Sequence, residues 1–132
     1  MSIKIAIFDF DDTLVHEGFE PPIECEDALK VIQFFKKKKY IICIATFNEY
    51  GIELCEQTSF CKYVDMIIAL NTDDNKDYHF RTILDHYQCN PEDCIVFDDI
   101  KENIKHAKEL GMKAKLVKWK QGVTINDAKD MI

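Results

Sequence analysis

The sequence has no long hydrophobic run, repeat, low-complexity segment or Gly/Ser-rich linker. No stretch reaches the roughly 18 consecutive apolar residues that a membrane-spanning helix requires. The amino-terminal stretch "MSIKIAIFDFDD" also lacks the pattern of a secretory signal peptide, because its short apolar part runs directly into acidic residues. The length of 132 residues suits a single domain. We therefore expect one cytoplasmic domain over residues 1–132, with no membrane partner.

The sequence has fewer basic than acidic residues: 17 Lys and Arg against 24 Asp and Glu, which gives a net charge of −7. Non-specific binding to nucleic acid needs dense Lys and Arg to neutralise phosphates. A nucleic-acid partner is therefore not expected. The four lysines at 36–39 close a predicted helix, where positive charge complements the helix dipole, and we interpret them as solvated.

No C-x-x-C pair and no export signal accompany the six cysteines. In a reducing compartment such cysteines are usually small buried hydrophobic residues. The sequence therefore predicts neither a disulfide framework nor a zinc site.

The sequence does contain short apolar runs that alternate with helical patterns. The runs predict strands over residues 3–8, 40–45, 64–70, 94–97 and 113–117. The helical patterns cover residues 28–35, 49–58, 80–87 and 100–107, and a short helix follows Thr124. Continuous apolar runs are typical of strands buried on both faces. The pattern predicts an α/β fold of three layers, Rossmann-like, with a central parallel sheet of about five strands.

Polar residues stand where several of these strands end, which is the edge of a parallel sheet where ligands gather. The stretch "IAIFDFDDTLV" at 5–15 ends its apolar run in aspartates. The residues at this edge are Asp9, Asp11, Asp12, Thr46, Asp98 and Asp99, with Lys76 ahead of a predicted helix. Each alone has an ordinary explanation as a helix cap, a turn residue or a solvated charge. Their order and spacing together indicate a site.

Crowded carboxylates repel one another, and a cation among them relieves that repulsion. Magnesium prefers hard oxygen ligands, usually one or two carboxylates with water and a substrate phosphate. Asp9 and Asp98 can supply the carboxylates. The sequence therefore predicts a Mg²⁺ cofactor.

The same residues resemble the four motifs of the haloacid dehalogenase (HAD) superfamily of phosphohydrolases. These are "DFDDT" at 9–13, a strand ending in Thr46, Lys76 before a helix, and a strand ending in the pair 98–99. They occur in order over nearly the whole chain. The segments "DYHFRTILDHY", "CIVFDDIKENI" and "VKWKQGVTI" are similar to the capless magnesium-dependent phosphatase type 1 group. That group usually has Arg where this chain has Phe47, and a longer segment between the first two motifs.

The resemblance implies magnesium-dependent hydrolysis of a phosphomonoester through an aspartyl-phosphate on Asp9. It makes Asp11 the general acid and base, and Thr46 and Lys76 the groups that hold the phosphate. Phe47 and Asn48, which follow Thr46, are candidate substrate contacts.

The resemblance also implies a metal site made of Asp9, Asp98 and the main-chain carbonyl of Asp11. Asp99 is expected to hold a metal-bound water or Lys76. Thr13 is expected to hydrogen-bond its own loop and to keep the Asp9 backbone in place.

Neither place where this superfamily carries a cap domain has room for one. Residues 14–45 hold a helix and a strand, which leaves 14–23 as a flap-like loop, and residues 47–75 are filled by another helix and strand. In the flap, His16 either contacts substrate or is an exposed loop residue. Lys118 and Lys120 follow the last strand and either attract an anionic substrate or are solvated.

Three alternatives stay open. A response-regulator receiver also uses acids, a hydroxyl and a Lys, but the order of the motifs disfavours it. A phosphate-binding or regulatory HAD-like module without turnover and a phosphomutase are the others. The phosphorylated substrate is a small molecule or a macromolecule, and the sequence does not indicate the oligomeric state.

Overall fold

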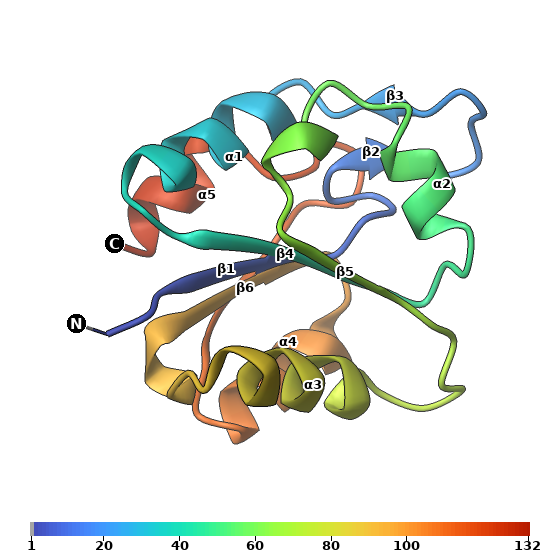
Figure 1. Ribbon diagram of the computed structural model, residues 1–132. Coiled ribbons are helices and arrows are strands. Elements are labelled where there is room, and N and C mark those ends of the chain that lie inside the picture. Colours follow the sequence, from blue (N-terminus) through green and yellow to red (C-terminus); the bar gives the residue numbers. More distant parts are fainter. Residues whose placement is uncertain (1) are drawn as a thin grey trace.

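The computed structural model describes residues 2–132 and has a five-stranded, all-parallel sheet at its centre (Figure 1). The strand order is β5-β4-β1-β6-β7, so β1 lies in the middle. The strands are β1 (Ile5–Phe8), β4 (Ile41–Thr46), β5 (Met66–Ala69), β6 (Cys94–Asp98) and β7 (Lys113–Leu116). The five predicted strands are confirmed, with shifts of at most two residues at their ends.

Helices cover both faces of this sheet. In Figure 1, α1 (Ala28–Lys37) and α5 (Ile125–Asp130) lie on one face, and α3 (Asp77–Tyr87) and α4 (Lys101–Glu109) lie on the other. The shorter elements are α2 (Gly51–Cys55), η1 (Cys61–Tyr63) and η2 (Pro91–Asp93). The three-layer α/β arrangement predicted from the sequence is therefore correct.

Each face of the sheet has its own apolar core, which explains the continuous apolar runs. On the α1 side, the ring of Phe8 stacks on Phe97 with centroids 5.1 Å apart, and Phe35 of α1 packs against both. On the other side, Ile7 and Val96 belong to the cluster that α3 and α4 cover. Burial on both faces fixes β1 and β6 in register and so fixes where their carboxyl ends lie.

Two segments differ from the sequence prediction. The helix predicted over 49–58 is the shorter α2, which begins at Gly51. The predicted flap is partly ordered as a two-stranded antiparallel ribbon, β2 (Val15–His16) with β3 (Ile23–Glu24), because their backbones pair directly.

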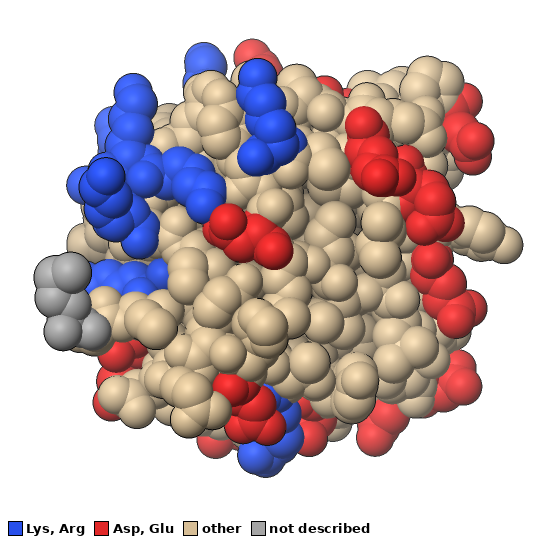
Figure 2. Space-filling model, viewed as in Figure 1, with Lys and Arg blue, Asp and Glu red and all other residues tan. Residues whose placement is uncertain are grey.

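Charge is distributed unevenly over the surface. Figure 2 shows Lys and Arg gathered near the amino-terminal ends of the strands and the end of α1, whereas Asp and Glu predominate along the edge near α2 and β3. Lys36, from the lysine run, pairs with Asp65 and is partly exposed.

All six cysteines are free thiols, as expected. No helix within residues 2–132 combines the length and the apolar character needed to cross a membrane.

Candidate active site

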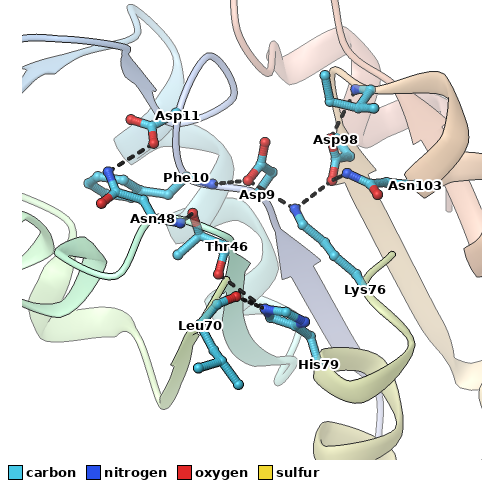
Figure 3. Close-up of polar contacts among 11 residues, drawn as sticks. Asp9, Phe10, Asp11, Thr46, Asn48, Leu70, Lys76, His79, Asp98 and Asn103 are labelled. Carbon is cyan, nitrogen blue, oxygen red and sulfur yellow. Dashed lines mark hydrogen bonds and ion pairs between the residues drawn. The ribbon is translucent and has the colours of Figure 1, made fainter. Parts of the chain in front are cut away.

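The carboxyl ends of the three central strands bring the predicted site residues together (Figure 3). Asp9 directly follows β1, Thr46 ends β4 and Asp98 ends β6. Because β1 pairs with both β4 and β6, these three ends are neighbours at one edge of the sheet. Lys76 reaches the same place from the amino-terminal end of α3.

Lys76 is the centre of the charge arrangement. Its side chain is 1% exposed, and its Nζ lies 3.0 Å from Oδ1 of Asp9 and 2.7 Å from Oδ2 of Asp98. Burial alone lowers the pKa of Lys76, but the two carboxylates outweigh this effect and raise it. Lys76 is therefore a fixed positive charge between two acidic strand ends.

Asp9 is held through one of its oxygens. Oδ1 accepts a hydrogen bond of 2.8 Å from the Phe10 N–H as well as the contact from Lys76. Among residues 2–132, no donor contacts Oδ2 of Asp9. Burial raises the pKa of Asp9 to about 6, with Lys76 opposing the rise and Asp99 adding to it.

Asp98 is held by more contacts. Oδ1 accepts from the Ile100 N–H at 2.9 Å, and Oδ2 accepts from Lys76 and from Nδ2 of Asn103 at 3.1 Å. Burial, followed by the charge of Asp9, raises the pKa of Asp98 to about 6. Asn103 was not foreseen; its position in the first turn of α4, just after Asp99, was the signal in the sequence.

Asp9, Asp98 and Asp99 fit a divalent cation. One carboxylate oxygen from each lies within 4.8 Å of the other two, and Asp9 and Asp98 are buried. Three carboxylates against the single charge of Lys76 leave an excess of negative charge that a hard cation would offset. Of the two roles expected for Asp99, a contact with Lys76 is not found among residues 2–132, because Lys76 rises between the ends of β1 and β6 and contacts Asp9 and Asp98 instead. The other role, holding a metal-bound water, stays a prediction.

Asp11 lies apart from the three-carboxylate group. Its Oδ2 accepts a hydrogen bond of 2.9 Å from Nδ2 of Asn48 (Figure 3). The pKa of Asp11 is raised, chiefly by burial and only secondarily by the charge of Asp12, while Asn48 lowers it. Removal from water is therefore a larger cause of this rise than crowding by neighbouring acids.

The turn after β4 orders the other predicted phosphate and substrate contacts. Oγ1 of Thr46 accepts from the Asn48 N–H at 3.1 Å, and Oδ1 of Asn48 accepts from the Tyr50 N–H at 2.9 Å. The ring of Phe47 lies 5.4 Å from Nζ of Lys76, within cation–π range. The Phe47 ring therefore forms the side of the site that lies next to Lys76.

His79 supports this turn from below and was missed in the sequence. Its Nε2 lies 3.1 Å from the Thr46 carbonyl and 2.8 Å from the Leu70 carbonyl, so Nε2–H joins the ends of β4 and β5. Burial lowers the pKa of His79, which keeps the ring neutral. Its spacing of three residues from Lys76, on the same face of α3, was the available signal.

The loop after Asp9 is held through its backbone. The Thr13 carbonyl accepts from the Val123 N–H at 2.9 Å, and Thr13 N–H donates to the Phe10 carbonyl. The expected hydrogen bond between Thr13 and its loop is therefore made by the backbone. The Thr13 hydroxyl is buried and has no hydrogen-bond partner among residues 2–132.

The site opens into two adjoining pockets. The first, of about 200 Å³, is lined by residues that include Asp9, Asp11, Thr46, Lys76 and Asp99, and we call it the catalytic pocket. The second, of about 500 Å³, lies between the flap and the turn after β4, and we call it the flap pocket.

Lys120 and His16 lie near this opening. Both line a third pocket of about 230 Å³, together with Asp12, Glu17 and Trp119, and His16 also lines the flap pocket. Lys118 instead pairs with Gly122 in an isolated bridge.

No protein-family model and no curated protein matches this sequence. Solved structures do match the fold. A haloacid dehalogenase-like family hydrolase from Streptococcus pneumoniae has a TM-score of 0.76 and 14% identity, over 98% of this chain and 90% of that one. The D,D-heptose 1.7-bisphosphate phosphatase from B. bronchiseptica, complexed with magnesium and phosphate, has a TM-score of 0.74 and 16% identity, over 98% and 85%.

The β-phosphoglucomutase from Clostridium difficile has a TM-score of 0.77 and 10% identity, over 98% of this chain and 96% of that one. At these identities the likeness concerns the fold alone. The chain has the haloacid dehalogenase-like fold.

Proposed function

We propose that this chain is a HAD-superfamily enzyme that hydrolyses a phosphomonoester with the help of Mg²⁺, through an aspartyl-phosphate on Asp9. The observation that carries the proposal is the placement of Lys76 between Asp9 and Asp98, with Asp99 close enough to complete a three-carboxylate group. A buried lysine flanked by carboxylates can neutralise a transferring phosphoryl group in a site of low dielectric.

In the first step, Oδ2 of Asp9 attacks the phosphorus atom and the bond to the leaving oxygen breaks. Asp9 suits this role because Phe10 and Lys76 hold Oδ1 and leave Oδ2 without a protein donor among residues 2–132. Asp11 donates its proton to the leaving oxygen, and its raised pKa keeps that proton available.

In the second step, a water molecule attacks the phosphorus atom of the aspartyl-phosphate, and Asp11 takes the proton of that water. The bond between phosphorus and the Asp9 oxygen breaks. Inorganic phosphate leaves, and both aspartates return to their starting states. One carboxyl group can serve as acid and then as base because its proton is lost in the first step and regained in the second.

Lys76 and the Thr46 hydroxyl would hold the non-bridging oxygens of the phosphoryl group, since both line the catalytic pocket. Asp9, Asp98 and Asp99 would hold the Mg²⁺ ion. A bound Mg²⁺ supplies positive charge that offsets the repulsion between an anionic nucleophile and an anionic substrate.

The replacement Asp9→Asn tests the nucleophile. We expect phosphate release from phenyl phosphate in Mg²⁺ buffer to fall by about a thousandfold or more, because the amide cannot form the acyl phosphate. Asp85→Asn, an exposed change on α3, is the matched control and should keep full activity.

Mass spectrometry after rapid quenching should locate a phosphoryl group on the peptide that contains Asp9. Equal turnover by wild type and Asp9→Asn, or an adduct on another peptide, contradicts the proposal. Release of inorganic phosphate, rather than an isomeric phosphate ester, separates hydrolysis from a mutase reaction.

A further inference from the structure

The flap pocket adjoins the catalytic pocket on the side of the general acid. Asp11, Glu17, Phe47 and Asn48 line both pockets, so the two share a wall. The leaving oxygen of a phosphomonoester must lie beside the group that protonates it. With Asp11 in that role, a substrate whose phosphate fills the catalytic pocket extends its leaving group into the flap pocket.

The lining of the flap pocket is aromatic on several sides. Phe10 is fully buried below it, Phe47 forms the shared wall, and Phe19 at the flap is 51% exposed. Together these three aromatic side chains give a concave site an apolar lining, which is typical of a pocket that binds an apolar group. The volume of about 500 Å³ is that of a small-molecule site.

The formally charged residues of the flap pocket are acidic. Asp11, Glu17 and Glu20 line it together with His16, and none of the described residues lining it is Lys or Arg. The surrounding surface is also acidic, as Figure 2 shows for the edge near α2 and β3. A second anionic group on the substrate would therefore meet an excess of like charge, with no Lys or Arg in the described lining to pair with.

The walls of the pocket are held in place before any substrate arrives. The Glu17 N–H donates to Oδ1 of Asp12 at 3.1 Å, at one end of the flap. At the other end, the Glu24 carboxylate accepts from both the N–H and the hydroxyl of Ser59. The β2–β3 ribbon joins these two ends. A pocket with fixed walls can discriminate between leaving groups.

We propose that the flap pocket binds the leaving group of the substrate and selects a neutral or cationic, ring-bearing group over one that carries a second phosphate or a carboxylate. This inference rests on the proposed phosphohydrolase function. It assigns Phe19, Glu17 and Glu20 to substrate selection.

The test compares kcat/KM for phenyl phosphate, para-carboxyphenyl phosphate and para-(aminomethyl)phenyl phosphate in Mg²⁺ buffer. We expect wild type to prefer phenyl phosphate over the carboxylate by about tenfold or more. In the double variant Glu17→Gln, Glu20→Gln, this preference should fall by about tenfold. The ratio of kcat/KM for para-(aminomethyl)phenyl phosphate to that for para-carboxyphenyl phosphate should fall as well. Comparing variants cancels the intrinsic reactivity of each ester.

Glu53→Gln is the matched control, because Glu53 is an exposed acid on α2 that does not line the pocket. It should keep the wild-type preference. Phe19→Ala should raise KM for phenyl phosphate while leaving inhibition by inorganic phosphate unchanged, because inorganic phosphate needs only the catalytic pocket. If Phe19→Ala weakened the binding of phenyl phosphate and of inorganic phosphate by the same factor, the assignment of Phe19 would be overturned.

Each other outcome also decides between the proposals. Turnover without discrimination in wild type, or discrimination that the double variant retains, overturns the leaving-group assignment and leaves the phosphohydrolase proposal standing. A preference for the carboxylate that Lys120→Gln abolishes places the leaving group in the Trp119–Lys120 pocket instead. No turnover of any ester by wild type overturns the proposed function and this inference with it.

Discussion

The side-chain amide of Asn48 donates a hydrogen bond of 2.9 Å to Oδ2 of Asp11 and so links the loops that follow β4 and β1. The same side chain accepts from the Tyr50 N–H through Oδ1. Asn48 therefore orients the proposed general acid, Asp11, from a turn that is itself held by hydrogen bonds of Asn48 with Thr46 and Tyr50.

The replacement Asn48→Asp should raise the pKa of Asp11, because it removes a donor that favours the carboxylate and adds a like charge. Asp11 must be protonated in the first step, so the fall of kcat/KM at high pH should move to higher pH. A pH profile of kcat/KM measures this shift. Asn126→Asp, an exposed change on α5, should leave the profile in place. An unmoved profile in Asn48→Asp would mean that Asp11 does not control this limb.

The stability of the metal-free protein should depend on pH through Asp9 and Asp98. Their pKa values rise from 3.8 to about 6 on folding, so the native state binds more protons than the unfolded state between these values. The free energy of unfolding should therefore fall as pH rises from about 4 to about 6, by an amount on the order of 3 kcal/mol for one such group.

Urea denaturation in a chelating buffer across this range measures the effect. In Asp98→Asn one of the two groups no longer titrates, so the decline should be shallower than in wild type. An equally steep decline in the variant would show that other groups dominate.

Magnesium should stabilise wild type at pH 7, because the proposed site is the three-carboxylate group in its charged form. A concentration one hundred times the dissociation constant adds about 2.7 kcal/mol to the free energy of unfolding. Thermal melts with and without Mg²⁺ should show this as a rise in Tm. Asp98→Asn should reduce the rise, whereas Asp93→Asn in η2 should retain it. A Tm that Mg²⁺ does not change in wild type would argue against a metal site here.

Gly51→Ala should disturb the proposed phosphate contact at Thr46. A Cβ at position 51 would lie 2.8 Å from Cγ2 of Thr46 and 3.3 Å from Cβ of Ala69, and neither atom belongs to a long flexible side chain. Overpacking of this kind costs about 1–3 kcal/mol of stability. We expect a lower free energy of unfolding and a higher inhibition constant for inorganic phosphate.

Glu53→Ala on the same helix is the control for a change in helix propensity, since Glu53 is exposed. If Gly51→Ala matches wild type in both measurements, the backbone near residue 51 can move to admit the added Cβ. The tight packing of Gly51 against Thr46 then has no effect on stability or on phosphate binding.

The five parallel strands could be predicted because apolar runs and helical periods are local properties of the chain. The same reasoning placed Asp9, Thr46 and Asp98 at strand ends, since those residues directly follow or end apolar runs. Local pattern was weaker for α2. In the sequence, Gly51 is a poor helix former in the first turn of the helix predicted over 49–58. The structure shows a second property of this position, because a Cβ there would lie 2.8 Å from Cγ2 of Thr46.

What the sequence alone determined is the set of chemical groups and the edge of the sheet at which they meet. The tertiary structure decided which of them touch. Lys76 contacts Asp9, 67 positions away, and Asp98, but not Asp99, because strand order and register place the ends of β1 and β6 on either side of it. The shape and charge of the flap pocket likewise arise from the packing of segments that are distant in sequence, which no local pattern records.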